Sequence, residues 1–192
     1  PVVIAVVLMV LIIVGAVGVK LYEKYSYSKE TMDLSRYYGI EKEGQVPIIL
    51  ADVVAEEKAA NIDGNDYLPL SFVQEQLNSR FYYDMNEKLL LYTTALDLYE
   101  IPLDSTTYTV SGEAAEHTCP IFVLQDEVPY VSLSFMENFS NFICNVYEAP
   151  HRLQIYTENV THQTAVIQKA TAVRYQGGIK SDILEQQDAG SQ

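Results

Sequence analysis

The chain has 192 residues and carries 26 acidic against 12 basic side chains, a formal net charge of −14 at pH 7. Nucleic-acid binding needs a basic patch that neutralises phosphates, and a chain this acidic offers none, which excludes nucleic acid as a partner. The anionic cytoplasmic leaflet of a membrane would also repel this charge. We therefore expect the bulk of the chain to lie outside the cytoplasm, at the cell surface.

The first predicted element is a membrane-spanning helix. The run Val2–Val19 contains only apolar residues and Gly, and Lys20 is the first charge. At the helical rise this run is about 27 Å long, close to the hydrocarbon thickness of a bilayer. Tyr22 and Lys24 follow, residue types that settle among lipid headgroups. The sequence predicts a transmembrane anchor over residues 1–24, with the lipid bilayer as its partner.

A cleaved signal peptide is the alternative interpretation of this run. Gly15, Ala16 and Gly18 are small enough to precede a signal-peptidase cut. Signal peptides, however, have apolar regions of roughly 7–15 residues, shorter than this one. The length therefore favours an uncleaved anchor.

The pattern changes twice after the anchor. Residues 25–45 are polar without a sustained period, which predicts a juxtamembrane spacer. Short runs of β-forming residues separated by turn signals then predict strands, with a tight turn at Asp63–Asp66. The candidate strands are Val46–Val54, Phe81–Met85, Lys88–Thr93, Tyr108–Ser111, Pro120–Leu124, Phe142–Tyr147 and Arg152–Thr157.

An internal repeat is the most informative feature of the sequence. Tyr67–Gln74 aligns with Tyr130–Glu137 at a constant offset, and one inserted residue then aligns Leu89–Thr93 with Leu153–Thr157. The repeat predicts an α+β fold in which two small copies each combine β-strands with one short helix. The first copy covers residues 46–101 and the second 102–158.

Each copy has a helix-start signal at the same place. Ser71 is followed by Gln74, and Ser134 by Glu137, and both pairs fit the S-x-x-[EQ] capping box. In such a box the hydroxyl accepts from a backbone N–H of the first turn, and the longer side chain bonds back to the cap residue. We therefore expect Ser71 and Ser134 to cap the two short helices.

The first copy, from Asp63 to Leu91, resembles a known repeat, the one named after the N-terminal domain of copper amine oxidases. The resemblance implies a stalk or wall-associated module of Gram-positive surface proteins, with neither copper ligands nor cofactor. The second copy departs from the pattern, with Ser132 in place of Pro and Cys144 in the strand after the helix. The residues that carry the resemblance are Asp63, Gly64, Tyr67-Leu68-Pro69-Leu70, Leu77, Tyr82-Tyr83-Asp84 and Lys88-Leu89-Leu90-Leu91.

The tail, residues 159–192, is expected to hold a connector and the first strands of an incomplete β-barrel. Residues 172–184, with a Val-Arg strand, a loop and Ser-x-Ile-Leu, resemble the opening of a bacterial Src-homology-3-like domain. The order of anchor, spacer, two repeats and this segment resembles the N-terminal part of membrane-anchored family-18 glycoside hydrolases of clostridia-type bacteria. That likeness is one of architecture and does not by itself give function.

No catalytic motif stands out in the sequence. Family-18 enzymes use a D-x-x-D-x-D-x-E strand, and the nearest acidic cluster, Asp97–Glu100, lacks the preceding carboxylates. Glycoside hydrolysis needs an acid and a second group held in one cleft. We therefore predict that the chain is not itself an enzyme.

The two cysteines allow two interpretations. Cys119 and Cys144 fall in the second copy on predicted neighbouring strands, which suits a disulfide in an oxidising compartment. The alternative is two buried thiols that act as small hydrophobic groups. A metal site with His117 is not predicted, because paired Cys-x-x-Cys spacing is missing. His151 and His162 are expected to be solvated surface residues.

The sequence thus predicts a membrane-anchored, non-catalytic accessory region of a cell-wall-associated protein. In this hypothesis the repeats are a stalk for a glycoside hydrolase. A rival hypothesis is a membrane-tethered module that binds cell-wall glycan, peptidoglycan or another protein.

Overall fold

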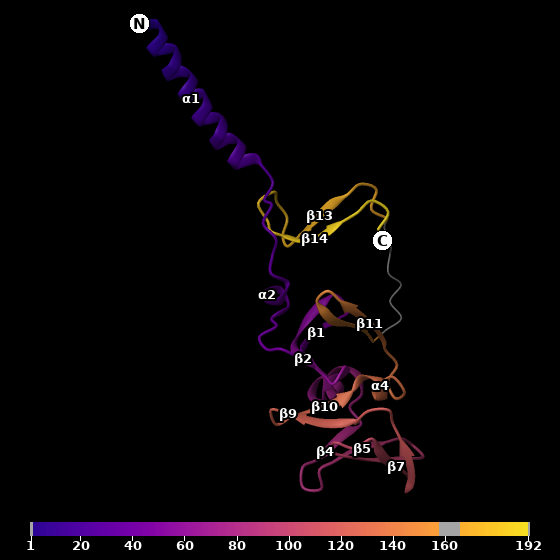
Figure 1. Cartoon of the computed structure of the whole chain (residues 1–192). Coiled ribbons are helices and arrows are strands. Elements are labelled where there is room, and N and C mark those ends of the chain that lie inside the picture. Colours follow the sequence, from indigo (N-terminus) through magenta and orange to yellow (C-terminus); the bar gives the residue numbers. More distant parts are fainter. Residues whose placement is uncertain (1, 158–165, 192) are drawn as a thin grey trace. The chain divides into compact units, whose positions relative to one another are not determined.

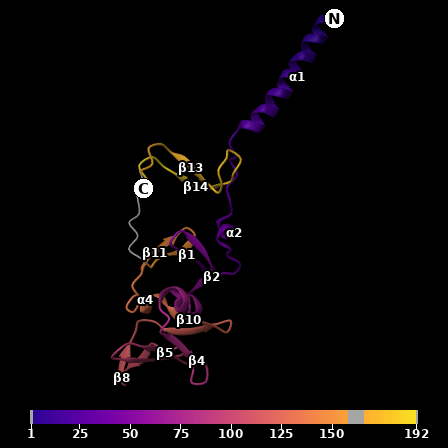
Figure 2. The ribbon, with the colours of Figure 1, turned by 180° about the vertical axis from the view of Figure 1, so that it is seen from behind.

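The computed structural model describes residues 2–157 and 166–191. The chain forms two compact units, one of residues 1–34 with 163–192 and the other of residues 35–162. The first unit is discontinuous in sequence, since the second is inserted between its two parts. Figure 1 gives the element labels, and Figure 2 shows the ribbon from behind.

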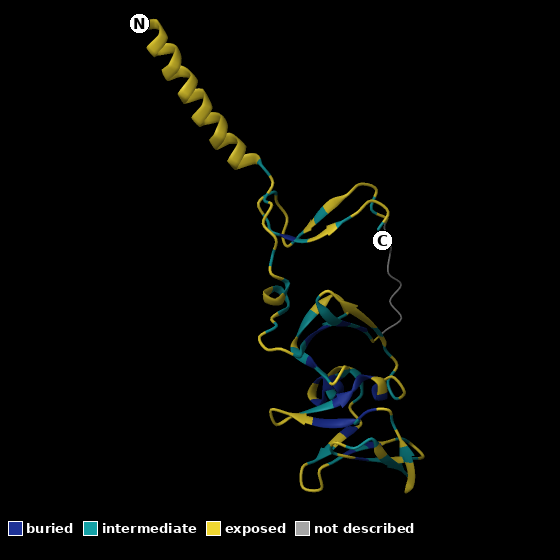
Figure 3. Ribbon diagram, viewed as in Figure 1, coloured by how far each residue is buried: buried dark blue, intermediate teal, exposed yellow. Residues whose placement is uncertain are grey.

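The discontinuous unit begins with the predicted apolar helix. Helix α1 covers Val2–Tyr25, and its described side chains are exposed along its whole length (Figure 3). The unit also holds the hairpin of β13 (Thr171–Arg174) and β14 (Ile183–Gln187). Ile183 is its one buried side chain among the described residues. The apolar surface of α1 is therefore not covered by the described protein.

The continuous unit is a β-module of two sheets. Seven strands form a mixed sheet in the order β11-β12-β1-β2-β3-β10-β9, and five form an antiparallel sheet in the order β4-β5-β6-β7-β8. A short helix, α2 (Leu34–Tyr38), precedes them. The strands are β1 Gln45–Leu50, β2 Val53–Ile62, β3 Asn65–Pro69, β4 Phe81–Asp84, β5 Leu89–Thr93, β6 Leu98–Pro102, β7 Thr107–Val110, β8 Glu113–Glu116, β9 Phe122–Gln125, β10 Val128–Ser132, β11 Ile143–Glu148 and β12 His151–Tyr156.

Both predicted copies contribute to one hydrophobic core. Strand β1 of the first segment pairs in parallel with β12 of the second, with Ile48 opposite Leu153. Both of these side chains are fully buried. The same cluster includes Phe72, Phe81 and Leu90 of the first segment and Ile121, Phe135 and Met136 of the second. The two segments are therefore parts of one packed body.

Two hairpins of the large sheet share one register. In the β2–β3 hairpin Ala60 lies opposite Tyr67, and in the β9–β10 hairpin Val123 lies opposite Tyr130, each 63 residues later. Strands β3 and β10 then pair with each other, with Leu68 opposite Val131, again 63 residues apart. The pairing around Leu68 and Val131 is thus a local two-fold arrangement.

The one-residue insertion that the sequence predicted between the two copies is not needed to align their second hairpins. In the β4–β5 hairpin Phe81 lies opposite Tyr92, and in the β11–β12 hairpin Cys144 lies opposite Ile155. Both positions again differ by 63 residues, so this prediction was wrong. The matching of side-chain types had suggested the shift, whereas the backbone register and the inward alternation of the strands decide the alignment.

The capping predictions are also corrected. Helix α3 (Leu70–Phe72) begins one residue before Ser71, its N-cap is Pro69, and no side chain caps it. A π-helical turn, η1 (Val73–Leu77), continues it, and Gln74 Nε2 donates to the Phe81 carbonyl at 2.7 Å. The strand of each copy runs directly into the helix, so the serine lies inside the first turn.

The second helix repeats this arrangement. Helix α4 covers Leu133–Met136 with Ser132 as its N-cap and no side-chain capping bond. Ser134 lies within the helix, and Glu137 stands at its C-cap, where its N–H donates to the Leu133 carbonyl. Neither predicted pair forms a capping box.

Most predicted strands are present, but one predicted strand corresponds to parts of two strands in the structure. The run Val46–Val54 is two strands, because the chain turns at Ala51, whose φ is +54°. Strand β2 continues through Glu56, Glu57 and Lys58 to Ile62, a charged stretch that hid it from pattern analysis. The turn at Asp63-Gly64 is confirmed, with φ of +51° and +80°.

Candidate functional site

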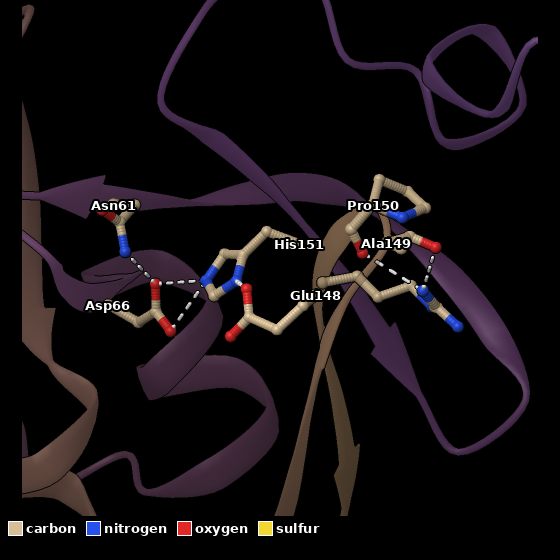
Figure 4. Close-up of polar contacts among 7 residues, drawn as sticks. Asn61, Asp66, Glu148, Ala149, Pro150 and His151 are labelled. Carbon is tan, nitrogen blue, oxygen red and sulfur yellow. Dashed lines mark hydrogen bonds and ion pairs between the residues drawn. The ribbon is translucent and has the colours of Figure 1, made fainter.

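A connected cluster of titratable side chains surrounds His151, the first residue of β12 (Figure 4). The two-residue turn Ala149-Pro150 precedes it and joins it to β11. Arg152 braces this turn, since its Nη1 donates to the carbonyls of Ala149 and Pro150, each at 3.1 Å. The local backbone thereby aims the imidazole toward the start of β3.

Both imidazole nitrogens of His151 face carboxylates. Nε2 lies 2.9 and 3.1 Å from the two carboxylate oxygens of Asp66, and Nδ1 lies 3.2 Å from Glu148 Oε2. Asp66 also accepts a hydrogen bond of 2.8 Å from Asn61 Nδ2. The side chains of His151 and Asp66 are 29% and 12% exposed, so this pair is largely withdrawn from water, whereas Glu148 is 82% exposed.

The pKa of His151 is raised by its surroundings. Burial lowers the pKa, but the hydrogen bonds and negative charges of Asp66 and then of Glu148 outweigh that effect. The protonated imidazolium, with an N–H on each nitrogen, is the form that can donate to both carboxylates. The arrangement therefore favours a charged histidine that ties β12 to β3.

This geometry suits an ion pair better than catalysis. A general base needs a free ring nitrogen within reach of a substrate proton, and here each nitrogen of His151 already has a carboxylate partner. An open groove lies beside the cluster. It is lined by Gly44, Gln45, Val46, Asn61, Gly64, Glu148 and His151. The sequence-based expectation that His151 is a solvated surface residue is wrong, because the imidazole is largely buried against Asp66. The sequence did not reveal this contact, since the two residues are 85 positions apart in the chain.

A second polar network surrounds Cys119, which is 5% exposed. Its Sγ lies 3.6 Å from His117 Nδ1 and 3.5 Å from Ser132 Oγ. Ser132 Oγ lies 2.9 Å from Ser134 Oγ, which lies 3.4 Å from His117 Nε2. The network gives the buried Ser132 hydroxyl its partners, so its structural role is clear. Ser134, predicted as a cap, belongs to this network instead.

The two cysteines are free thiols in the structure. Cys119 precedes β9 and lies against Ser132 of β10, whereas Cys144 lies in β11, an edge strand of the seven-stranded sheet. Burial raises the pKa of the Cys144 thiol to about 12, with the charges of Glu137 and Asp66 adding to the effect. The pairing of the two cysteines stays a prediction.

No three His, Cys, Asp or Glu side chains of residues 2–157 and 166–191 come together as a metal site. His162 lies outside the described residues. One helix of the described chain, α1, is long and apolar enough to cross a membrane. Its apolar side chains are not buried by any other part of the described protein.

Searches of protein families, curated proteins and solved structures find no match to this chain.

Proposed function

We propose that this chain is a membrane-anchored accessory region that displays a non-catalytic β-module outside the cytoplasm, next to the cell wall. The observation that carries the proposal is α1, Val2–Tyr25. None of the residues in its most apolar stretch is buried by the described protein. Its run Val2–Val19 is uncharged and has apolar side chains on every side of the helix, which is stable in lipid and poorly suited to water.

The side of the membrane is inferred from charge. Residues 35–162 hold 6 basic and 20 acidic side chains, so the β-module carries the whole net charge of −14. Such a body is repelled most strongly by the anionic cytoplasmic leaflet and less by an outer leaflet that carries less anionic lipid. The extracytoplasmic assignment rests on this repulsion.

A duplicated module of wall-associated type is part of the proposal. Its support is the shared 63-residue spacing of the two hairpins and of the Leu68–Val131 pair. The resemblance to copper amine oxidase N-terminal repeats, and the attachment to a glycoside hydrolase, rest on the sequence likeness alone.

A second candidate is a binding module rather than a stalk, and one observation favours it. An in-line stalk joins one neighbouring segment at its first end and a different one at its last end, and so holds the two apart. Here the chain enters the module at residue 35 and leaves it at 162, and both ends lead into the same unit. A module attached in this way is displayed as an insertion, which suits binding to glycan, peptidoglycan or a protein.

The membrane step is tested with the full chain expressed in bacteria and fractionated in alkaline carbonate. Val7→Lys with Leu11→Lys places two charges in the apolar run, each costing about 2.5–3.5 kcal/mol at a helix centre. We expect the native chain in the membrane pellet and the double variant in the soluble fraction. The matched control, Val7→Leu with Leu11→Val, should stay in the pellet. A native chain that is released by carbonate contradicts the anchor.

The two candidates are separated by retention on isolated cell walls. The full chain in detergent should be retained if the module binds wall material, and the matched detergent blank accounts for nonspecific adsorption. A chain that is not retained supports display or spacing without binding.

A further inference from the structure

The segment after α1 pairs with the C-terminal hairpin. The Ser28 N–H donates to the Ile179 carbonyl at 2.7 Å, and the Met32 N–H donates to the Ile183 carbonyl at 2.8 Å. The Ile183 N–H in turn donates to the Glu30 carbonyl at 2.8 Å. Residues 28–32 of the predicted spacer are therefore held along the hairpin by backbone hydrogen bonds, shortly after the apolar helix.

Arg174 strengthens this contact. Its Nη2 donates to the Ser28 carbonyl at 3.0 Å, its Nη1 donates to the Ser181 carbonyl, and its guanidinium lies 5.5 Å from the ring centre of Tyr27. The guanidinium thus joins the hairpin to the juxtamembrane segment through two carbonyls and an aromatic face. Arg174 thereby positions the juxtamembrane segment against the hairpin.

Lys180 extends the contact to the helix itself. Its Nζ donates to the carbonyl of Glu23, in the last turn of α1. The last four carbonyls of a helix lack intrahelical partners, and of these the Tyr22 carbonyl is bonded by the Ser26 N–H at 2.7 Å. A cation at this end is also favoured by the helix dipole. The hairpin therefore supplies a cation to the end of the apolar helix.

The depth of that cation is set by helix geometry. The uncharged run ends at Val19, and Glu23 lies four residues further, about 6 Å along the axis. The headgroup layer on each side of a bilayer is about 5–8 Å thick. When α1 spans the membrane, the Lys180 ammonium lies within this layer.

Two further cations lie at the same level. Lys20 and Lys24 are one helical turn apart, on one face of α1, and are exposed. Within the described residues, none of Lys20, Lys24 and Lys180 forms an ion pair, although Glu23 lies in the same turn. Three exposed ammonium groups at headgroup depth are therefore free to meet anionic groups of the lipid.

We infer that Lys20, Lys24 and Lys180 bind the phosphate of anionic phospholipid headgroups, and that the β13–β14 hairpin is a second membrane-contact element. This inference rests on the proposed membrane anchor. The ligand is lipid rather than free phosphate, because the site lies where headgroup phosphate is concentrated. Soluble phosphate would have only these three exposed side chains to hold it.

A tryptophan reporter tests the inference in the full chain. The chain contains no Trp, so Gly177→Trp adds a single one to the loop between β13 and β14. A Cβ at Gly177 meets nothing within 4 Å, so a side chain can leave the backbone there without a clash. The protein is placed in vesicles of phosphatidylcholine and phosphatidylglycerol, with bromine on the chains of one lipid or the other.

We expect quenching of the reporter, and stronger quenching from brominated phosphatidylglycerol. Lys180→Gln and Lys20→Gln should each lower the preference for phosphatidylglycerol about fivefold, the equivalent of about 1 kcal/mol per cation at the surface. The matched control, Lys88→Gln in the β-module, should leave the preference unchanged. High salt should weaken it, and glycerol phosphate should weaken it no more than sodium chloride of the same ionic strength does.

Three results would overturn the inference. These are a reporter that neither lipid quenches, equal quenching by both lipids, and a loss of the preference to added glycerol phosphate that exceeds the loss to sodium chloride, which would mean a soluble phosphate site. Lys20→Gln keeps the test sharp if Lys180→Gln loosens the hairpin, a change that hydrogen exchange at the Ile183 amide detects. A chain that fails to sediment with the vesicles contradicts the anchor itself, which separates that failure from the failure of the headgroup site.

Discussion

The two units of this chain differ in how they are charged and in what holds them together. Residues 1–34 with 163–192 hold six basic and six acidic side chains, whereas the β-module of residues 35–162 holds 6 basic and 20 acidic. The module has a large buried core, while in the described part of the other unit only Ile183 is buried. The module is thus stabilised by its own packing.

The membrane-proximal unit depends on other forces. Its described contacts include the β13–β14 pairing, the backbone hydrogen bonds between residues 28–32 and 179–183, and the carbonyl bonds of Arg174 and Lys180, while the apolar surface of α1 stays uncovered. A neutral unit with a cationic helix end suits a lipid surface, and an acidic unit with a closed core suits water. This difference between the two units is the one that the proposed membrane anchor would require.

The largest expected effect comes from breaking the shared core of the module. Leu68 is fully buried and lies opposite Val131, so Leu68→Ala should lower the free energy of unfolding by about 2–5 kcal/mol. Hydrogen exchange should then accelerate together at Leu90 and Leu153, in the two predicted copies, while the Ile183 amide stays unchanged.

The matched control for this change is Leu124→Ala in β9, where the side chain is 37% exposed and little apolar area is lost. If only the first copy loses protection in Leu68→Ala, the two copies are independent domains and the single-core account fails.

A smaller, pH-dependent effect is expected at His151. His151→Gln removes the charged partner of Asp66, and hydrogen bonds to charged groups contribute about 1.5–3 kcal/mol. Because the folded chain raises the pKa of His151 above its ordinary value of 6.5, it holds the proton more tightly than the unfolded chain. The stabilisation is therefore complete below the unfolded pKa and is lost as pH rises through the folded pKa.

Urea unfolding of the native chain and of His151→Gln across this range measures the effect. Glu148→Gln, at the exposed end of the cluster, should change stability less than His151→Gln. A difference between the native chain and His151→Gln that is constant from acid to alkaline pH would show that His151 contributes no charge.

The smallest expected effects sharpen the comparison of the two hairpins inside the module. Gly64 has φ of +80°, and its counterpart 63 residues later is Glu127, with φ of +66°. Glu127→Gly should raise the free energy of unfolding by about 0.5–1 kcal/mol, since glycine adopts this conformation without strain, and Gly64→Ala should lower it by a similar amount. Thermal unfolding checks both. Shifts of the same sign would mean that the two turns are not equivalent.

Local sequence signals predicted the parts of the fold that depend on short-range chemistry. The apolar helix, most strands and the Asp63-Gly64 turn are explained by uninterrupted hydrophobicity, alternation and turn residues, and the structure has them. The caps failed at Ser71 and Ser134 because strand pairing carries β3 and β10 directly into the helices. A capping pattern cannot report where a preceding strand ends.

Long-range pairing was beyond such signals. Nothing near His151 indicates Asp66 as its partner, and nothing in the spacer indicates the hairpin that pairs with Ser28–Met32. The 63-residue spacing was visible in the sequence. The pairing of the two copies with each other at Leu68 and Val131 depends on the sheet, which a single sequence does not reveal.

The most direct test of the account is protease treatment of intact cells that produce the full chain. If α1 anchors the chain and the β-module lies outside the cytoplasm, protease added to intact cells should cleave the chain, while a cytoplasmic marker stays whole. An antibody against residues 35–162 should then find fragments shorter than the full chain. A chain that stays intact until the cells are lysed, or that is found free in the medium without protease, would contradict the account.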